Sequence, residues 1–204
     1  MVSSFSTSIF TVVSATITAY GFARFEFKGK GILFSLMIST LFLPQVVLNI
    51  PQFLLFRTWG WTNSYLPLVV PAFFGAEPYF IFMLVQFMRS VSRELEEAAE
   101  IDGCNSFERL VYIVVPMVKP AILSIGIIFF INSWNEYVWP SLILKSTENY
   151  TLSLALQMFV SAEGGTDIPV AMAISVLTML LPLGIYSVCQ KYIINTFAQS
   201  GIKG

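Results

Sequence analysis

The densest group of charged side chains in the sequence lies between residues 89 and 120. Its carboxylates predict an acidic surface, with a solvated linker as the alternative; they are Glu94, Glu96, Glu97, Glu100, Asp102 and Glu108. The sequence has no histidine, the commonest general base, and its aspartates, Asp102 and Asp167, are not paired. Its two cysteines, Cys104 and Cys189, lie too far apart to form a CxxC motif. We therefore expect no catalytic residue, no metal site and no disulfide.

The same stretch carries the signals of two short helices joined by a turn. Ser92 is a residue type that caps helix starts, and Gly103 is the type that ends helices in the left-handed conformation. Asn105, followed three residues later by Glu108, resembles a capping box that begins the second helix. The pattern predicts a helix–turn–helix held against the membrane surface.

Two other features of this stretch concern its packing and its end. Ala98 and Ala99 are small, so they leave room for another backbone to approach closely. We expect the second helix to close at Pro116 and Pro120, because proline removes a hydrogen bond from a helix interior.

A second group of polar side chains lies inside an apolar segment, at Asn132, Trp134, Asn135 and Glu136. A charged side chain at the centre of a membrane helix costs roughly 2.5–3.5 kcal/mol, so it usually faces a cavity or a partner. Hydrogen-bonding groups beside aromatic rings suit the hydroxyls and ring faces of a sugar, so one interpretation is the lining of a translocation path. The alternatives are a network that joins helices, or a hydrated position near the outer interface. Glu77, beside a proline, is interpreted as a structural break.

The elements that must position these groups are membrane-spanning helices. Hydrophobic residues make up 56% of the 204 residues and charged residues 11%, whereas a soluble domain carries about 25% charged residues. A soluble domain of this length has too little interior to bury so much apolar surface. Because backbone groups in lipid must be satisfied internally, we expect an all-α membrane bundle in one domain, residues 1–204. Its five predicted spans are Phe5–Ala23, Ile32–Phe56, Leu66–Met88, Ala121–Leu144 and Val170–Cys189.

The distribution of positive charge predicts how these spans are oriented. Nine Lys and Arg residues lie in the segments that the spans place on one side, and only Arg57 and Lys145 lie on the other. By the positive-inside rule, residues 89–120 and the C-terminus are cytoplasmic. Five spans then put the N-terminus outside without a leader, so we expect a preceding helix to be absent from this chain. The net charge of −1 offers no basic field for nucleic acid.

The spacing within the acidic stretch resembles the EAA loop of binding-protein-dependent ABC permeases. The matching residues are Glu97-Ala98-Ala99, three residues, Gly103, nine residues, and then Ile113-Val-Val-Pro116. The family usually has leucine where Val115 stands. Three further segments resemble carbohydrate permeases of the maltose-permease kind: Ala19–Phe25, Ser133–Pro140 and Ser200–Gly204. Such subunits usually have six spans, which agrees with an absent first helix.

The resemblance implies a mechanism and a set of partners. The loop would be a coupling helix that docks in a cleft of a separate ATPase subunit, so ATP is used by the partner and no cofactor is bound by this chain. The implied assembly in the cell membrane holds two ATPase subunits, a second permease and an extracytoplasmic solute-binding protein, with a sugar-like solute. The coupling residues carried over are Glu97, Ala98, Ala99, Asp102, Gly103, Ile113 and Pro116.

Two other classes of membrane protein remain as alternatives. A secondary transporter would couple transport through polar sites on broken helices, often in repeated halves, and the sequence shows no convincing internal repeat. A secondary transporter would also leave the acidic loop without a purpose. A purely structural membrane subunit is the other alternative. The sequence has no GxxxxGK motif, and Gly29-Lys30-Gly31 lacks the upstream glycine, so energy must come from another chain.

Overall fold

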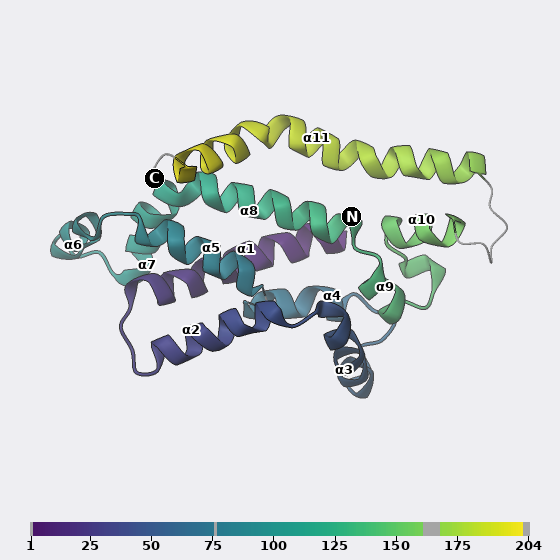
Figure 1. Cartoon of the computed structure of the whole chain (residues 1–204), viewed down its shortest axis with the longest axis horizontal. Coiled ribbons are helices and arrows are strands. Elements are labelled where there is room, and N and C mark those ends of the chain that lie inside the picture. The colour runs from purple at the N-terminus through teal and green to yellow at the C-terminus, as the bar shows by residue number, and fades with distance from the viewer. Residues whose placement is uncertain (1, 76, 161–167, 202–204) are drawn as a thin grey trace.

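The computed structural model describes residues 2–75, 77–160 and 168–201, and the regular elements within these ranges are helices (Figure 1). They are α1 (Val2–Arg24), α2 (Lys30–Ser39), α3 (Gln45–Thr58), α4 (Leu66–Val69), α5 (Pro78–Arg89), α6 (Arg93–Ile101), α7 (Ser106–Arg109), α8 (Val115–Asn135), α9 (Val138–Ile143), α10 (Leu152–Val160) and α11 (Ile168–Gly201). Short 3-10 turns lie at Thr40–Phe42, Val70–Phe74 and Thr147–Asn149, and a π-turn lies at Leu110–Val114.

Several of these helices are long and apolar enough to cross a membrane. In the described part of the chain they are Ser3–Arg24, Leu66–Arg89, Ser106–Asn135 and Ile168–Gln190. A fifth span results if the bent pair Lys30–Phe42 and Gln45–Thr58 is counted as one. The predicted all-α membrane bundle of about five spans is therefore confirmed.

The second predicted span, Ile32–Phe56, corresponds to the bent pair formed by α2 and α3 rather than to one straight helix. Its two halves meet at an angle of 104°. The bend lies at Leu43, which is extended with ψ 121° and directly precedes Pro44. A proline ring clashes with a helical residue before it, so the helix cannot continue through this position.

The fourth predicted span, Ala121–Leu144, is wrong at both ends. The helix begins at Ser106, within the loop, and continues through Pro116 and Pro120 to Asn135. These prolines do not close it, because Pro116 lies in the first turn of α8, directly after the π-turn that adjusts the hydrogen-bond pattern. The Pro120 carbonyl oxygen accepts a hydrogen bond from the Ser124 hydroxyl at 2.9 Å. The loop helix and the span are thus one element.

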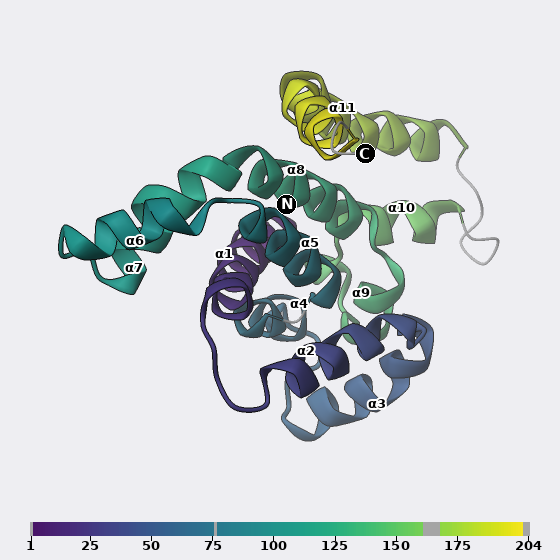
Figure 2. The same ribbon diagram turned by 60° about the vertical axis from the view of Figure 1, so that its left-hand side comes forward.

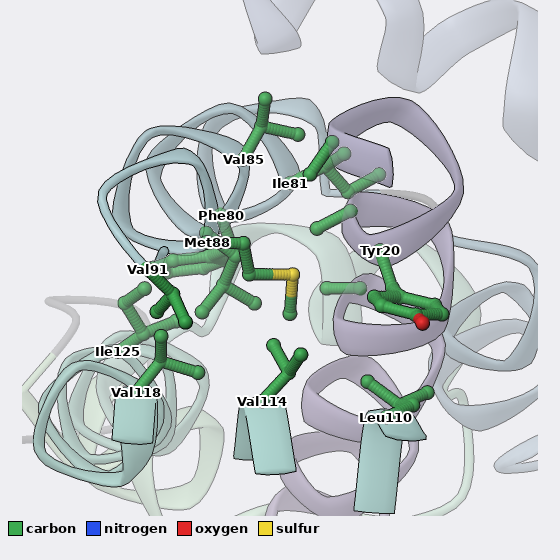
Figure 3. Packing of buried hydrophobic residues seen from close by; sticks show 14 of the residues in the cluster. Tyr20, Phe80, Ile81, Val85, Met88, Val91, Leu110, Val114, Val118 and Ile125 are labelled. Carbon is green, nitrogen blue, oxygen red and sulfur yellow. The ribbon is translucent and has the colours of Figure 1, made fainter. Parts of the chain in front are cut away.

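The main hydrophobic core lies where α1, α5 and α8 meet (Figures 2 and 3). Along α1 the core residues Ala15, Ala19 and Ala23 recur every fourth position and are at most 2% exposed. Small residues at this spacing let neighbouring helices approach closely. Met88 of α5 and Val114 of the π-turn are fully buried and point into the same interior.

The elements divide between two ends of the bundle (Figure 1). The α6 and α7 helices, the connection from α1 to α2 and the C-terminal end of α11 lie at one end. The α3, α9 and α10 helices lie at the opposite end. The segments that carry most of the positive charge therefore share one end.

The crossing of α1 and α8 predicts the effect of one substitution. A Cβ added at Gly126 would come within 3.2 Å of Val12 Cγ2. We expect Gly126→Leu to lower the free energy of unfolding by about 1–3 kcal/mol, the usual cost of overpacking. Unfolding in mixed micelles measures this loss.

The matched control is Gly184→Leu in α11, because a Cβ there meets no atom within 4 Å. The additional change Val12→Ala should restore part of the loss in the Gly126→Leu protein. Equal losses from the two glycine substitutions would show that the crossing is not tightly packed.

Candidate functional site

The α6 helix begins and ends as its sequence predicts. The Ser92 hydroxyl oxygen accepts a hydrogen bond from the Glu94 N–H at 3.3 Å and so caps the helix start. At the other end, Gly103 has a φ of +91°, in the left-handed region. The Cys104 N–H donates to the Ala99 carbonyl at 2.9 Å, which satisfies one of the last carbonyls of the helix.

The predicted capping box at the start of α7 is also confirmed. The Asn105 side-chain oxygen accepts from the N–H groups of Phe107 and Glu108, both at 3.0 Å. In return, the Glu108 carboxylate accepts from the Asn105 N–H at 2.7 Å. The Arg109 guanidinium forms an ion pair with Glu100 and so links α7 to α6. These local contacts fix the shape of the loop.

The α6 helix exposes some of the predicted coupling residues and buries others. Glu97 and Ala98 are exposed, as are Asp102 and Gly103 in the turn that follows. Ala99, in contrast, is only 9% exposed and faces its own chain. Farther along, Ile113 is half-buried and Pro116 is exposed. The surface open to another protein therefore includes Ala98 but not Ala99.

Glu96 does not belong to the acidic surface that the sequence analysis expected, because it is buried. Its carboxylate lies 2.6 Å from the Arg24 Nε at the end of α1, and each side chain is 8% exposed. The approach is not aligned as a hydrogen bond, so the contact is chiefly electrostatic. The Tyr20 hydroxyl donates to the other carboxylate oxygen at 3.1 Å, and the Arg24 guanidinium also donates to the Val91 carbonyl at 2.9 Å.

This buried network is the feature that the sequence analysis missed. Glu96 and Ala99 lie three positions apart and share the inner face of α6. Helical spacing alone could have predicted that these two residues share a face. The partners, Tyr20 and Arg24, come from more than 70 residues earlier in the chain. No local pattern identifies them.

A cavity of about 500 Å³, whose mainly apolar lining includes several polar side chains, lies at the opposite end of the bundle, between α1, α3, α5, α8 and α9. Asn132 and Glu136 line it, together with Glu77 and Asn49, which the sequence analysis did not assign to a path. The Asn49 side-chain oxygen has no hydrogen-bond partner within the described residues, although Asn49 is only 6% exposed. Further polar side chains in the lining are Ser3, Ser4, Thr7, Gln45, Ser133 and Thr151.

The other two residues of the predicted path lie elsewhere. Trp134 is 4% exposed, and its indole N–H donates to the Thr178 carbonyl of α11 at 3.0 Å. Its ring stacks on Phe130, with the ring centroids 5.9 Å apart. Asn135 is exposed and is not among the residues that line the cavity. The tryptophan thus joins two helices, which is the packing role weighed as an alternative for this segment.

Glu136 has a structural role as well as a place in the cavity. Its carboxylate accepts hydrogen bonds from the N–H groups of Val138 and Trp139, at 2.7 and 3.1 Å. These are the first N–H groups of α9, which have no partner within the helix. The carboxylate therefore caps α9 while it faces the cavity.

Glu77 directly precedes α5, after a left-handed Gly75, and this confirms the predicted break in its span.

The buried ion pair predicts a difference between single and double substitutions. Glu96→Gln or Arg24→Gln alone should lower the free energy of unfolding by about 3–5 kcal/mol, because each leaves a buried charge without its partner. The double substitution should cost less than the sum. Unfolding of all three variants in mixed micelles measures the coupling between the two residues.

The control for the single substitutions is Glu100→Gln, whose side chain is 63% exposed. Loss of this exposed ion pair should cost only about 0–1 kcal/mol. Additive effects of Glu96→Gln and Arg24→Gln would contradict the inferred coupling.

Comparison with known proteins places this geometry in a family. The family described as "Binding-protein-dependent transport system inner membrane component" matches residues 11–197. The arabinooligosaccharides transport system permease protein AraQ of Bacillus subtilis is 31% identical over 97% of this chain and 69% of its own length. The sulfoquinovosyl glycerol transport system permease protein SmoH of Agrobacterium fabrum is 31% identical over 100% of this chain and 71% of its own length.

A solved structure shares the fold. A bacterial ABC transporter involved in the import of the acidic polysaccharide alginate contains a chain that superposes with a TM-score of 0.72. The two chains are 24% identical, and the match covers 93% of this chain and 74% of the other. Together with the family match across residues 11–197, the chain belongs to the binding-protein-dependent transport system inner membrane components, the membrane-spanning permease subunits of ABC transporters.

Proposed function

We propose that this chain is a permease subunit of an ATP-driven importer for sugars or oligosaccharides. The named relatives that support this are permeases of arabinooligosaccharide and sulfoquinovosyl glycerol transport systems. The observation that carries the coupling role is a capped, ordered loop that presents an exposed face and is tied to α1 by a buried ion pair.

The contact with the ATPase is proposed to involve the outer face of α6 and its turn. Glu97, Ala98 and Asp102 are exposed there, and Ile101 is 87% exposed beside them. An exposed apolar side chain among carboxylates suits a protein interface better than a surface that remains in water. Ala99 supports this contact from within, through its packing against its own chain.

The translocation path is proposed to include Asn132 and Glu136 in the cavity between α1, α3, α5, α8 and α9, with Glu77 and Asn49 beside them. Hydrogen-bond acceptors dominate this set, and sugar hydroxyls are donors that can satisfy them. The helix that begins in the loop at Ser106 ends at Asn135, so the same element connects the coupling loop to the cavity.

The proposed assembly contains two ATPase subunits, a second permease and an extracytoplasmic solute-binding protein. In this assembly ATP is bound by the ATPase subunits and not by this chain. The end of the bundle with α6, α7 and the C-terminus would be cytoplasmic, because the connections at that end are richest in Lys and Arg. The cavity then lies towards the outer side, where a binding protein would deliver solute.

Site-directed crosslinking tests the coupling face. A cysteine at Ala98, in a protein whose Cys104 and Cys189 are replaced, should crosslink to the ATPase with a yield that changes when ATP is added. A cysteine at Ala99 is the matched control, because that position is buried and should react weakly. No crosslink from position 98 in an assembled transporter would contradict the proposed docking face.

Two substitutions at Glu136 separate its charge from its capping role. Glu136→Gln keeps an oxygen that can accept from the α9 N–H groups, so thermal stability should hold while transport falls. Glu136→Ala should lower both, with a stability loss of about 1 kcal/mol for the lost cap. The measurement is ATP-driven uptake of labelled arabinooligosaccharides by proteoliposomes that hold the assembled transporter. Full uptake by the Glu136→Gln protein would exclude a role for this charge in the path.

A further inference from the structure

A second cavity, of about 510 Å³, lies at the end of the bundle that carries the coupling loop. It is formed where the connection from α1 to α2 meets the connection from α5 to α6. Its lining holds four cationic side chains and one acidic side chain: Arg24, Lys30, Arg89, Arg93 and Glu26. Neither the transport path nor the proposed contact with the ATPase uses this cavity.

Two of the four cations are neutralised by partners within the chain. Arg24 pairs with Glu96, and the Lys30 ammonium lies 2.9 Å from the Glu26 carboxylate. Arg89 and Arg93 have no carboxylate within 4.0 Å among the residues that the structure describes. The cavity therefore carries two positive charges that no carboxylate in the described part of the chain pairs with.

The positive charges around the cavity also affect the carboxyl group of Glu26. A hydrogen bond from Lys30, and then its charge, hold the pKa of the Glu26 carboxyl below its usual range, with smaller contributions from Arg93 and Arg89. The guanidinium groups of Arg89 and Arg93 thus act on the same space that Glu26 and Lys30 line. An anion in that space would meet both guanidinium groups.

The surface next to the cavity is apolar. No residue of α2 is buried, and its side chains Ile32, Leu33 and Leu36 are 51–69% exposed. Phe25 and Phe27, in the connection that precedes α2, are 43% and 42% exposed. In a membrane protein such side chains are suited to contact with acyl chains. The basic cavity therefore lies where a lipid molecule would place its headgroup.

We propose that this cavity binds the phosphate of an anionic phospholipid headgroup, with the acyl chains along α2. Guanidinium groups bind phosphate oxygens through paired, charge-assisted hydrogen bonds, so Arg89 and Arg93 are the residues that hold it. Arg89 is partly preorganised, because its guanidinium carbon lies 5.7 Å from the centre of the Phe34 ring. Basic pockets beside membrane helices on the cytoplasmic side are suited to anionic headgroups.

The inference uses the proposed orientation of the chain, but its test does not depend on transport. The purified chain in detergent is incubated with equal amounts of phosphatidylglycerol and phosphatidylcholine, and retained lipid is counted by native mass spectrometry. We expect the wild-type protein to retain at least fivefold more phosphatidylglycerol than phosphatidylcholine. The variant Arg89→Gln/Arg93→Gln should lose this preference.

Two matched variants keep the test specific. Arg57→Gln/Lys145→Gln removes the same charge from segments that the positive-inside rule assigns to the other side, and it should leave the preference unchanged. Arg89→Lys/Arg93→Lys should keep part of it. Equal losses from the two glutamine double variants would overturn the site, because they would show an effect of net charge alone.

Two further outcomes identify other sources of the anion. Inorganic phosphate that displaces phosphatidylglycerol at millimolar concentration would show that the cavity takes a free anion, and this would overturn the lipid assignment. Full retention of phosphatidylglycerol by Arg89→Gln/Arg93→Gln, together with loss of the nucleotide-dependent crosslink from position 98, would overturn it in favour of an acidic surface on the ATPase.

Discussion

The buried contact between Glu96 and Arg24 is the interaction on which the rest of the coupling loop depends. The loop extends beyond the hydrophobic core that unites α1, α5 and α8, so apolar packing alone would hold it weakly. One carboxylate on the inner face of α6 meets a guanidinium at the end of α1, and a tyrosine hydroxyl satisfies its second oxygen. Because both groups are buried, separating them would leave a charge with neither a partner nor solvent, which costs free energy. The exposed side chains of α6 thereby acquire a defined direction.

Charged side chains are arranged differently at the two ends of the bundle. At the loop end, carboxylates pair with cations: Arg24 with Glu96 across 72 residues, and Lys30 with Glu26 and Arg109 with Glu100 within ten residues. At the opposite end, Glu77 and Glu136 line a cavity in which the described lining residues include no lysine or arginine. Glu136 instead directs its carboxylate at the first N–H groups of α9, where the helix dipole favours negative charge. The second end therefore keeps acceptors available to a ligand that donates hydrogen bonds.

Local features of the fold could be predicted from the sequence, and features that depend on distant partners could not. Ser92, Gly103 and the pair Asn105 and Glu108 act within a few residues of themselves, so their roles follow from residue type. Pro116 and Pro120 misled the prediction, because a π-turn and a bundle of neighbouring helices tolerate prolines that would end an isolated helix. Which carboxylate of α6 turns inward depends on Arg24, and the direction of Trp134 depends on a carbonyl of α11. Neither partner can be chosen without the three-dimensional fold.

The continuous helix from Ser106 to Asn135 can convert a small tilt at one end into a larger displacement at the other end. Its 30 residues form a rod roughly 45 Å long at 1.5 Å per residue. On that length, a tilt of about 5° around the loop end moves the far end by roughly 4 Å. That displacement exceeds the length of a hydrogen bond, so it is enough to make or break contacts at Asn132. A small rotation at the loop end can thus change the contacts made at the cavity end, without any helix having to unfold.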